Sequence, residues 1–212
     1  FNEDGSVMYF FQGNNWYNGR VLIDTFRQDG DRLLSSDPFL GPVEIVFDQA
    51  APHFVNPGTV IFPSRRPGGY GGLDLYITTF ANGRWAPPEN LGPAVNSPYD
   101  ETTPFLARDG RTLFFSSNRS DKSIGGYDVF KSVYFAGHNL WTVPQNQGLP
   151  VNSAADDTHF RLSHDGFSAL FTSSRKDGMG ERDLYIAYYQ NLFREQESPA
   201  ELAQTFLHQF SA

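Results

Sequence analysis

A repeat of roughly fifty residues runs through this chain and constrains its fold more than any other feature of the sequence. A turn glycine followed by an apolar run occurs four times, in DGSVMYFF from Asp4, NPGTVIFPS from Asn56, DGRTLFFSS from Asp109 and DGFSALFTS from Asp165. The glycines are Gly5, Gly58, Gly110 and Gly166, at intervals of 53, 52 and 56 residues. A fixed period of this length is typical of solenoids and propellers.

Two further signals keep the same period. A glycine-rich loop precedes an aspartate and an apolar run in GGLDLYI from Gly71, GGYDVFK from Gly125 and GERDLYI from Gly180. A long connector, WAPPENLGPAVNSPYDETTP from Trp85, matches WTVPQNQGLPVNSAADDTHF from Trp141. Because three signals keep their order and offset, we divide the chain into repeats at 1–42, 43–94, 95–150 and 151–190 and a tail at 191–212.

Each repeat predicts three or four short strands. In the third repeat these are 103–107, 112–117 and 127–134, with a short fourth strand near Trp141. Asp109 and Gly110 predict a two-residue hairpin turn, since glycine tolerates the positive φ of such turns. Phe114 and Phe115 are adjacent, so they point to opposite faces and both faces of the sheet must be covered.

The pattern predicts an all-β fold, a β-propeller with at least four blades. No helical periodicity lies between the strands, so stacked sheets rather than helices are expected to cover them. The tail differs, because Ser198, Pro199 and Glu201 form a helix-start pattern. Leu202, Phe206 and Phe210 then fall on one face. A short C-terminal helix is expected there.

Composition and charge exclude several classes. The chain has 16 basic and 24 acidic residues, a net charge of −8, and no basic cluster, which argues against nucleic-acid binding. It has no cysteine, so disulfides and thiolate metal sites are excluded. No apolar run approaches the ~18 residues of a membrane helix. The chain begins at Phe1 without a signal sequence, and we interpret it as a piece of a mature or larger protein.

An arginine and an aspartate recur together in three repeats. Each Phe-x-Ser-x-Arg string ends in an arginine, and a loop aspartate follows eight or nine residues later. The predicted pairs are Arg66 with Asp74, Arg119 with Asp128, and Arg175 with Asp183. Catalytic groups would be unique rather than present in every repeat, so we interpret the pairs as structural.

Two acidic pairs, Asp100-Glu101 and Asp156-Asp157, lie in the connectors. Paired carboxylates suit Ca²⁺, which takes oxygen ligands, and they equally suit turn capping. The sequence leaves both readings open, together with contacts to a partner protein, and no other cofactor is expected. The five histidines show no HExxH spacing, no serine lies in a GxSxG elbow, and no GK[ST] follows the glycine-rich loops. An enzyme is therefore not expected.

The strings DGRTLFFSSNR, GGYDVFKS and PENLGPAVNSPYDETTPFLARDG resemble the WD-repeat-like propeller repeats of TolB-type proteins. The connector and the GGxDxY string are similar to versions in OmpA-family envelope proteins of Bacteroidetes, among them a periplasmic subunit of the type IX secretion system. The resemblance covers residues 43–190 best. It implies a non-enzymatic periplasmic protein, associated with the outer membrane, and association with peptidoglycan through other domains.

The leading functional hypothesis is a non-catalytic scaffold that binds other proteins of the bacterial cell envelope without spanning the membrane itself. The alternative is a propeller glycoside hydrolase or a carbohydrate-binding propeller. A glycosidase needs two carboxylates about 5–10 Å apart, and most acids here lie at repeat-equivalent positions. A propeller that gates a peptidase would require a hydrolase domain, and these 212 residues hold none.

Overall fold

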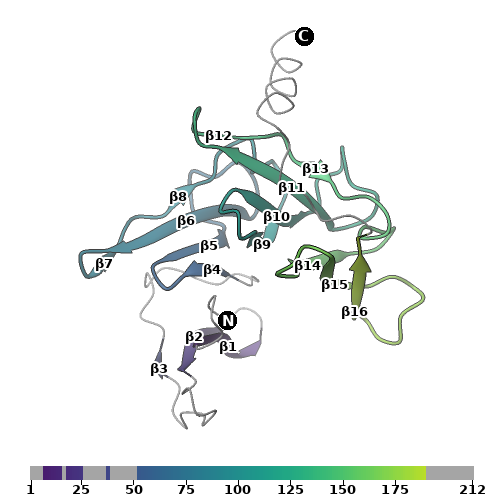
Figure 1. The fold of residues 1–212 in the computed structure, drawn as a ribbon, viewed down its shortest axis with the longest axis horizontal. Helices are drawn as coiled ribbons and strands as arrows, with labels where there is room; N and C mark the ends of the chain where they lie inside the picture. Colours follow the sequence, from purple (N-terminus) through teal and green to yellow (C-terminus); the bar gives the residue numbers. More distant parts are fainter. Residues whose placement is uncertain (1–6, 16–17, 26–36, 39–51, 190–212) are drawn as a thin grey trace.

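Four antiparallel β-sheets follow one another along the chain in the computed structural model of the protein (Figure 1). The structure describes residues 7–15, 18–25, 37–38 and 52–189. Each sheet lies within one of the four sequence repeats. These described residues contain no helix, so none that could cross a membrane, and the tail helix predicted from Pro199 lies outside them.

The strands of the four sheets have the following bounds. The first sheet holds β1 (Val7–Asn15), β2 (Asn18–Thr25) and β3 (Asp37–Pro38). The second holds β4 (His53–Asn56), β5 (Thr59–Ser64), β6 (Asp74–Ala81), β7 (Arg84–Trp85) and β8 (Glu89–Asn90). The third holds β9 (Glu101–Leu106), β10 (Thr112–Ser117), β11 (Asp128–Phe135), β12 (Leu140–Trp141) and β13 (Gln145–Asn146). The fourth holds β14 (Asp157–Leu162), β15 (Ser168–Ser173) and β16 (Asp183–Tyr188).

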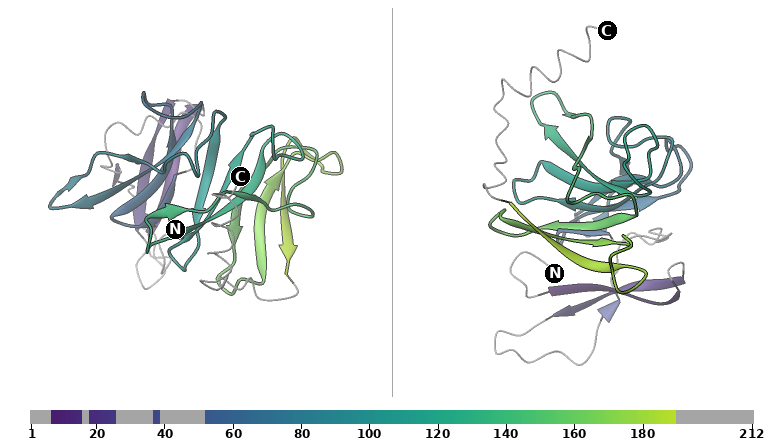
Figure 2. Two further views of the ribbon diagram at one scale, coloured as in Figure 1. Left: turned by 90° about the horizontal axis from the view of Figure 1, so that it is seen from above. Right: turned by 90° about the vertical axis from the view of Figure 1, so that its right-hand side faces the viewer.

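The second, third and fourth sheets pack against one another in chain order. Their first strands, β4, β9 and β14, lie toward the middle of the molecule, and the later strands fan outward (Figures 1 and 2). Strand β9 contacts β4, β5 and β6 of the preceding sheet, and β14 contacts β9, β10 and β11. We call β4, β9 and β14 the inner strands.

The prediction that both faces of a sheet are covered is confirmed for the third sheet. Phe115 packs with Ile61 of the second sheet in one core cluster. Its neighbour Phe114 packs with Phe160 and Phe171 of the fourth sheet in another. Both phenylalanines are almost fully buried, and full burial of such a side chain stabilises the fold by about 1.5–3 kcal/mol.

The prediction of a β-propeller is wrong. The described residues form separate antiparallel sheets of three to five strands, and these sheets do not close into a ring. Closure would require another sheet to cover the outer face of the fourth sheet. That face is open, because Leu184 is 67% and Tyr188 79% exposed. The third sheet packs on the second and the fourth on the third, and these local contacts do not by themselves impose closure.

The strand predictions for the third repeat are confirmed closely, although the turn is longer than predicted. Strand β10 has the predicted bounds, and the other strands agree within two residues. The Ala107 N–H donates to the Thr112 carbonyl, so the loop spans residues 108–111 rather than two residues. Gly110 has φ +70°, the left-handed conformation for which glycine is suited.

Glycines allow the loops before β6 and β11 to contact the next connector. A Cβ built on Gly125 would lie 2.4 Å from the Ala155 carbonyl oxygen and 2.5 Å from that of Ser153. At Gly71 the corresponding distance to the Ser97 carbonyl oxygen is 2.2 Å. These neighbours are backbone atoms, so they cannot rotate away from an added methyl group.

We therefore expect Gly125→Ala to lower the free energy of unfolding by about 1–3 kcal/mol, because the added methyl forces the two loops apart. Gly137→Ala is the matched control, since its Cβ would meet nothing closer than 3.9 Å. Its effect should stay within about 0.5 kcal/mol. Urea denaturation of both variants measures the difference, and equal effects would contradict the close-approach explanation.

Candidate functional site

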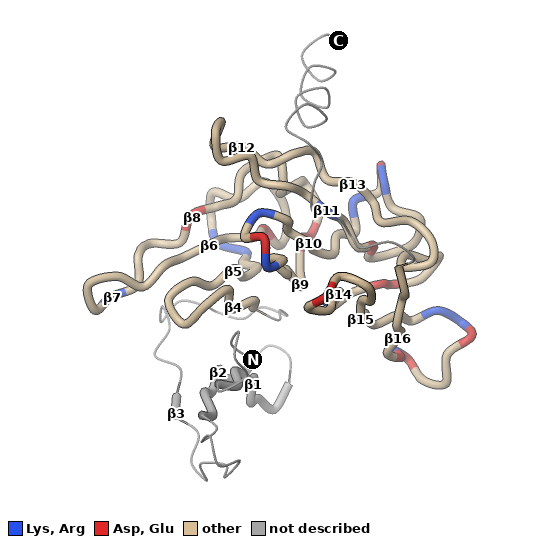
Figure 3. Tube along the Cα trace, viewed as in Figure 1, with Lys and Arg blue, Asp and Glu red and all other residues tan. Residues whose placement is uncertain are grey.

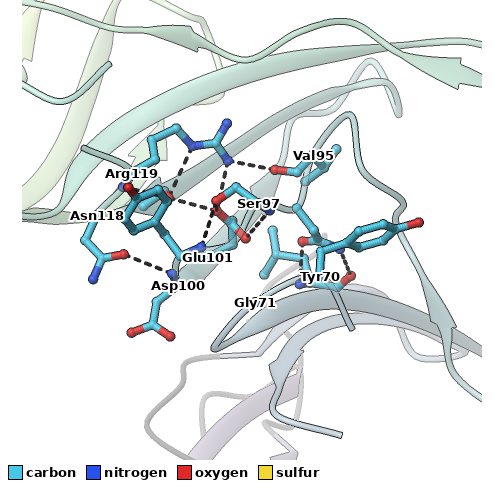
Figure 4. Close-up of polar contacts among 12 residues, drawn as sticks. Tyr70, Gly71, Val95, Ser97, Asp100, Glu101, Asn118 and Arg119 are labelled. Atoms are coloured by element: carbon cyan, nitrogen blue, oxygen red, sulfur yellow. Dashed lines mark hydrogen bonds and ion pairs between the residues drawn. The ribbon is translucent and has the colours of Figure 1, made fainter. Parts of the chain in front are cut away.

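The arginine that ends each Phe-x-Ser-x-Arg string is held inside its own sheet. The Arg119 guanidinium donates to Glu101 Oε1 at 2.9 Å and to the Val95 carbonyl at 2.7 Å (Figure 4). It also lies over the rings of Phe130 and Phe115, 5.0 and 5.4 Å from their centroids. Arg119 is 5% exposed and Glu101 fully buried, so this is a desolvated ion pair.

The fourth sheet repeats this arrangement. Arg175 donates to Asp157 Oδ1 at 2.9 Å and to the Val151 carbonyl at 2.9 Å, and it lies over the Tyr185 ring. In the second sheet Arg66 bonds to Ser64 Oγ and stacks on Tyr76. Arg119 and Arg175 thus pair with the acid at the start of the inner strand, not with the loop aspartates predicted from the sequence.

The loop aspartates bind backbone and amide groups instead. Asp74 accepts from the N–H groups of Tyr70 and Gly71 and from Asn90 Nδ2. Asp128 accepts from the Ile124 N–H and from Asn146 Nδ2, and Asp183 accepts from the Gly180 N–H. Each aspartate therefore fixes the glycine-rich loop that precedes its strand, which is a structural role.

The first member of each acidic pair connects two sheets. Asp100 accepts from the Leu73 N–H at 2.7 Å and from the Tyr127 hydroxyl at 3.0 Å. Asp156 accepts from the Tyr127 N–H at 3.0 Å and lies 3.5 Å from Arg182 Nη2. Burial and the Asp100 charge raise the pKa of the Tyr127 hydroxyl, so it remains a donor.

The second members, Glu101 and Asp157, are the buried partners of the repeated arginines. Burial raises the pKa of the Glu101 carboxyl, while donors from Ser97, Ser117 and Arg119 act in the opposite direction. The part of the chain that the structure describes holds no group of three or more His, Asp or Glu side chains placed to bind a metal ion. The oxygens considered for Ca²⁺ are engaged in bonds that join strands and loops.

The asparagines of the two VNS triplets were not singled out from the sequence, yet they bridge connector and sheet. Asn152 accepts from the Val129 N–H at 2.8 Å and donates to the Val129 carbonyl at 2.9 Å. Asn96 makes the same two bonds with Leu75. The sequence did contain a signal for these asparagines, since the VNS triplets repeat in step with the tryptophans. The asparagine amide can replace a neighbouring strand, because it offers both a donor and an acceptor.

With these polar groups engaged, the surface feature that stands out is the outer face of the fourth sheet. Leu170, Leu184, Ile186 and Tyr188 are 43%, 67%, 53% and 79% exposed. They lie on one face because Leu170 opposes Ile186 in the β15–β16 register, and Leu184 and Tyr188 are two residues away on either side. We call these four residues the outer apolar face.

The equivalent faces of the second and third sheets are buried against the next sheet. Phe114 and Val129, at the positions of Leu170 and Leu184, are buried in the cluster shared with the fourth sheet. Ile61 and Leu75 are buried in the same way beneath the third sheet. The outer apolar face therefore has the residue types of a sheet–sheet interface, while it remains exposed to solvent.

Charged residues of both signs lie over the described loops and strand ends (Figure 3). The outer apolar face itself contains no charged residue. Single exposed apolar side chains are ordinary on a protein surface, but four in register on one sheet face are typical of an interaction site.

No protein-family model and no curated protein sequence matches this chain. By structure, the chain is similar to part of a puromycin-hydrolysing peptidase of Mycobacterium tuberculosis, with a TM-score of 0.44 and 16% sequence identity. The match covers 81% of this chain and 24% of the peptidase, so the chain spans about a quarter of that protein. A TM-score this low carries no argument about function.

Proposed function

We propose that this chain is a non-catalytic module that binds a partner protein through the outer apolar face of its fourth sheet. The observation that carries the proposal is the exposure of Leu170 and Leu184 at positions whose equivalents pack on the next sheet in the second and third repeats. Ile186 and Tyr188 extend the same exposed face. A partner that offers a flat, uncharged apolar surface would remove these side chains from water.

The polar residues support a binding role over a catalytic one. The carboxylates selected from the sequence are each held by backbone N–H groups or by a repeated arginine, as Asp74 and Glu101 illustrate. A glycosidase would need one of its two acids free to donate a proton and the other free to attack or activate water.

The bacterial cell envelope is the proposed setting, with a periplasmic location and an envelope protein as partner. This part of the proposal rests on the resemblance of the strings around Asp109, Gly125 and Pro88 to the repeats of OmpA-family envelope proteins. A role in type IX secretion follows from the same resemblance.

A matched pair of variants tests the binding face. Leu184→Ser with Ile186→Ser removes apolar surface from the outer apolar face, and Leu140→Ser with Met179→Ser removes exposed apolar surface elsewhere. Each aliphatic side chain contributes about 1 kcal/mol or more when buried, so the first pair should weaken partner binding at least about 30-fold. The control pair should leave binding unchanged.

The partner is identified by a photo-crosslinking residue at Tyr188, followed by purification and titration against the wild type and both variants. Equal affinities for the two double variants would contradict the proposed face. Self-association through Tyr188, or turnover of a glycan or peptide without a crosslinked protein, would contradict the function itself.

A further inference from the structure

The inner strands bring together three residues at equivalent positions that differ among the second, third and fourth repeats. His53 opposes Ile61, Phe105 opposes Phe114 and Arg161 opposes Leu170, so the three occupy the same place in successive sheets. The His53 and Phe105 ring centroids are 5.2 Å apart, and the Arg161 guanidinium carbon lies 5.4 Å from the Phe105 centroid. The repeat preserves its structural residues, but these three residues vary. Such variation indicates a function that the sheets themselves do not need.

His159 joins this group through a distortion of β14. Two residues, His159 and Phe160, face a single residue of β15, and His159 has φ +57°. Thr103 has φ +46° at the corresponding bulge of β9, and its Oγ1 accepts from the His159 N–H. Positive φ is strained at residues other than glycine and is found where a bulge directs a side chain to a site. We call His53, Phe105, His159 and Arg161 the inner cluster.

Arg161 differs from Arg119 and Arg175, because no acid pairs with it in the part of the chain that the structure describes. Arg119 and Arg175 each have a carboxylate at 2.9 Å. Within residues 52–189, Arg161 makes a hydrogen bond to the Phe160 carbonyl and the contact with Phe105, and no carboxylate pairs with it. Burial lowers the pKa of Arg161 to about 10, as expected for a cation that has lost part of its hydration without gaining an anion among the described residues.

We infer that the inner cluster is a binding site for a carboxylate ligand, with the Arg161 guanidinium as the group that holds the anion. The guanidinium is planar and donates two parallel N–H groups to a carboxylate, while the Phe105 ring holds its plane in place. Arg161 and both histidines are half-buried, so solvent still reaches them.

The two histidines supply neutral polar groups around the anion. Burial and the neighbouring Arg161 charge lower the pKa of His53 to about 3. Burial and the charges of Arg161 and Arg182 lower the pKa of His159 to about 4. His159 Nδ1 is occupied by the hydroxyls of Thr158 and Thr172. A bound carboxylate would offset the Arg161 charge and raise both pKa values, so binding should strengthen as the pH falls.

The test uses the whole chain with sodium acetate, sodium succinate and inorganic phosphate as probes, against chloride at equal ionic strength. A carboxylate at 100 times its dissociation constant should raise the midpoint of thermal unfolding by about 5–10 °C. It should also shift the Arg161 Nε–H resonance in nitrogen-15 spectra. Absence of both effects, or an effect of phosphate without one of acetate or succinate, would overturn the carboxylate site.

Two variants separate binding from folding. Arg161→Leu should abolish the carboxylate effect while its own midpoint without ligand stays equal to or above that of the wild type. Arg161→Lys keeps the charge but loses the planar fork, so it should bind at least about tenfold more weakly. Arg84→Gln, at an exposed arginine of β7, is the control and should respond like the wild type. An undiminished carboxylate response in Arg161→Leu would overturn the assignment.

Discussion

Replacing Glu101 by alanine should lower the free energy of unfolding by about 3–5 kcal/mol, because it leaves the buried Arg119 guanidinium without its carboxylate. It also removes the acceptor for Ser117 Oγ and for the Ser97 N–H. Denaturant unfolding of wild type and variant measures the loss. The prediction concerns Glu101 rather than Asp128, since the structure shows Glu101 to be the acid that Arg119 contacts.

An exposed pair provides the comparison. Arg182 lies 3.5 Å from Asp156, with side chains 52% and 37% exposed, so Arg182→Ala should cost less than about 1 kcal/mol. The double variant Glu101→Ala with Arg119→Met should recover part of the loss, because no charge is then left unpaired. A Glu101→Ala variant as stable as Arg182→Ala would show that water reaches Arg119 and that the pair is not desolvated.

Acid should destabilise the protein between about pH 6.5 and pH 4 through His53 and His159. Both pKa values are lowered in the folded state, to about 3 and about 4, from 6.5 in the unfolded chain. As the pH falls below 6.5 the unfolded chain takes up protons that the folded protein does not, so stability is lost. At pH 5 each histidine should account for about 2 kcal/mol, before any reduction for partial exposure.

The measurement is the free energy of unfolding against pH for the wild type, His53→Gln and His159→Asn. Asparagine suits position 159 because it tolerates positive φ. In each variant, the slope of the unfolding free energy against pH should decrease by the equivalent of about one bound proton over this range. The buffers must be free of carboxylates, since an anion near Arg161 would raise the histidine pKa values. Curves parallel to that of the wild type would exclude the histidines as the cause.

The polar pairing illustrates where sequence reasoning failed and why. Arg119 and Asp128 recur at nearly constant spacing, and the spacing alone suggested a contact. Arg119 follows β10, and the pairing of β9 with β10 places Glu101 opposite Ser117, two residues before it. The arginine thus meets an acid eighteen residues earlier in the chain. The equal separation of Asp157 and Arg175 was the signal that would have found it.

The sequence by itself determined the number and nature of the sheets. Turn glycines, strand-forming runs and the adjacent Phe114 and Phe115 are local features, and the strands of the third repeat follow from them. Loop glycines such as Gly125 also indicate where a loop approaches the backbone of the next connector, because this close approach recurs at Gly71.

Only the tertiary structure decided whether the outer face of the fourth sheet is covered and which residues of different sheets meet. Whether Leu184 and Tyr188 are buried depends on contact with another surface. The alternation of apolar residues along β16 is the same whether or not that surface is present. The meeting of His53, Phe105 and Arg161 likewise arises from stacking three sheets about their inner strands. Periodicity reports which face a side chain occupies, whereas its neighbour on that face is set by contacts between segments far apart in the chain.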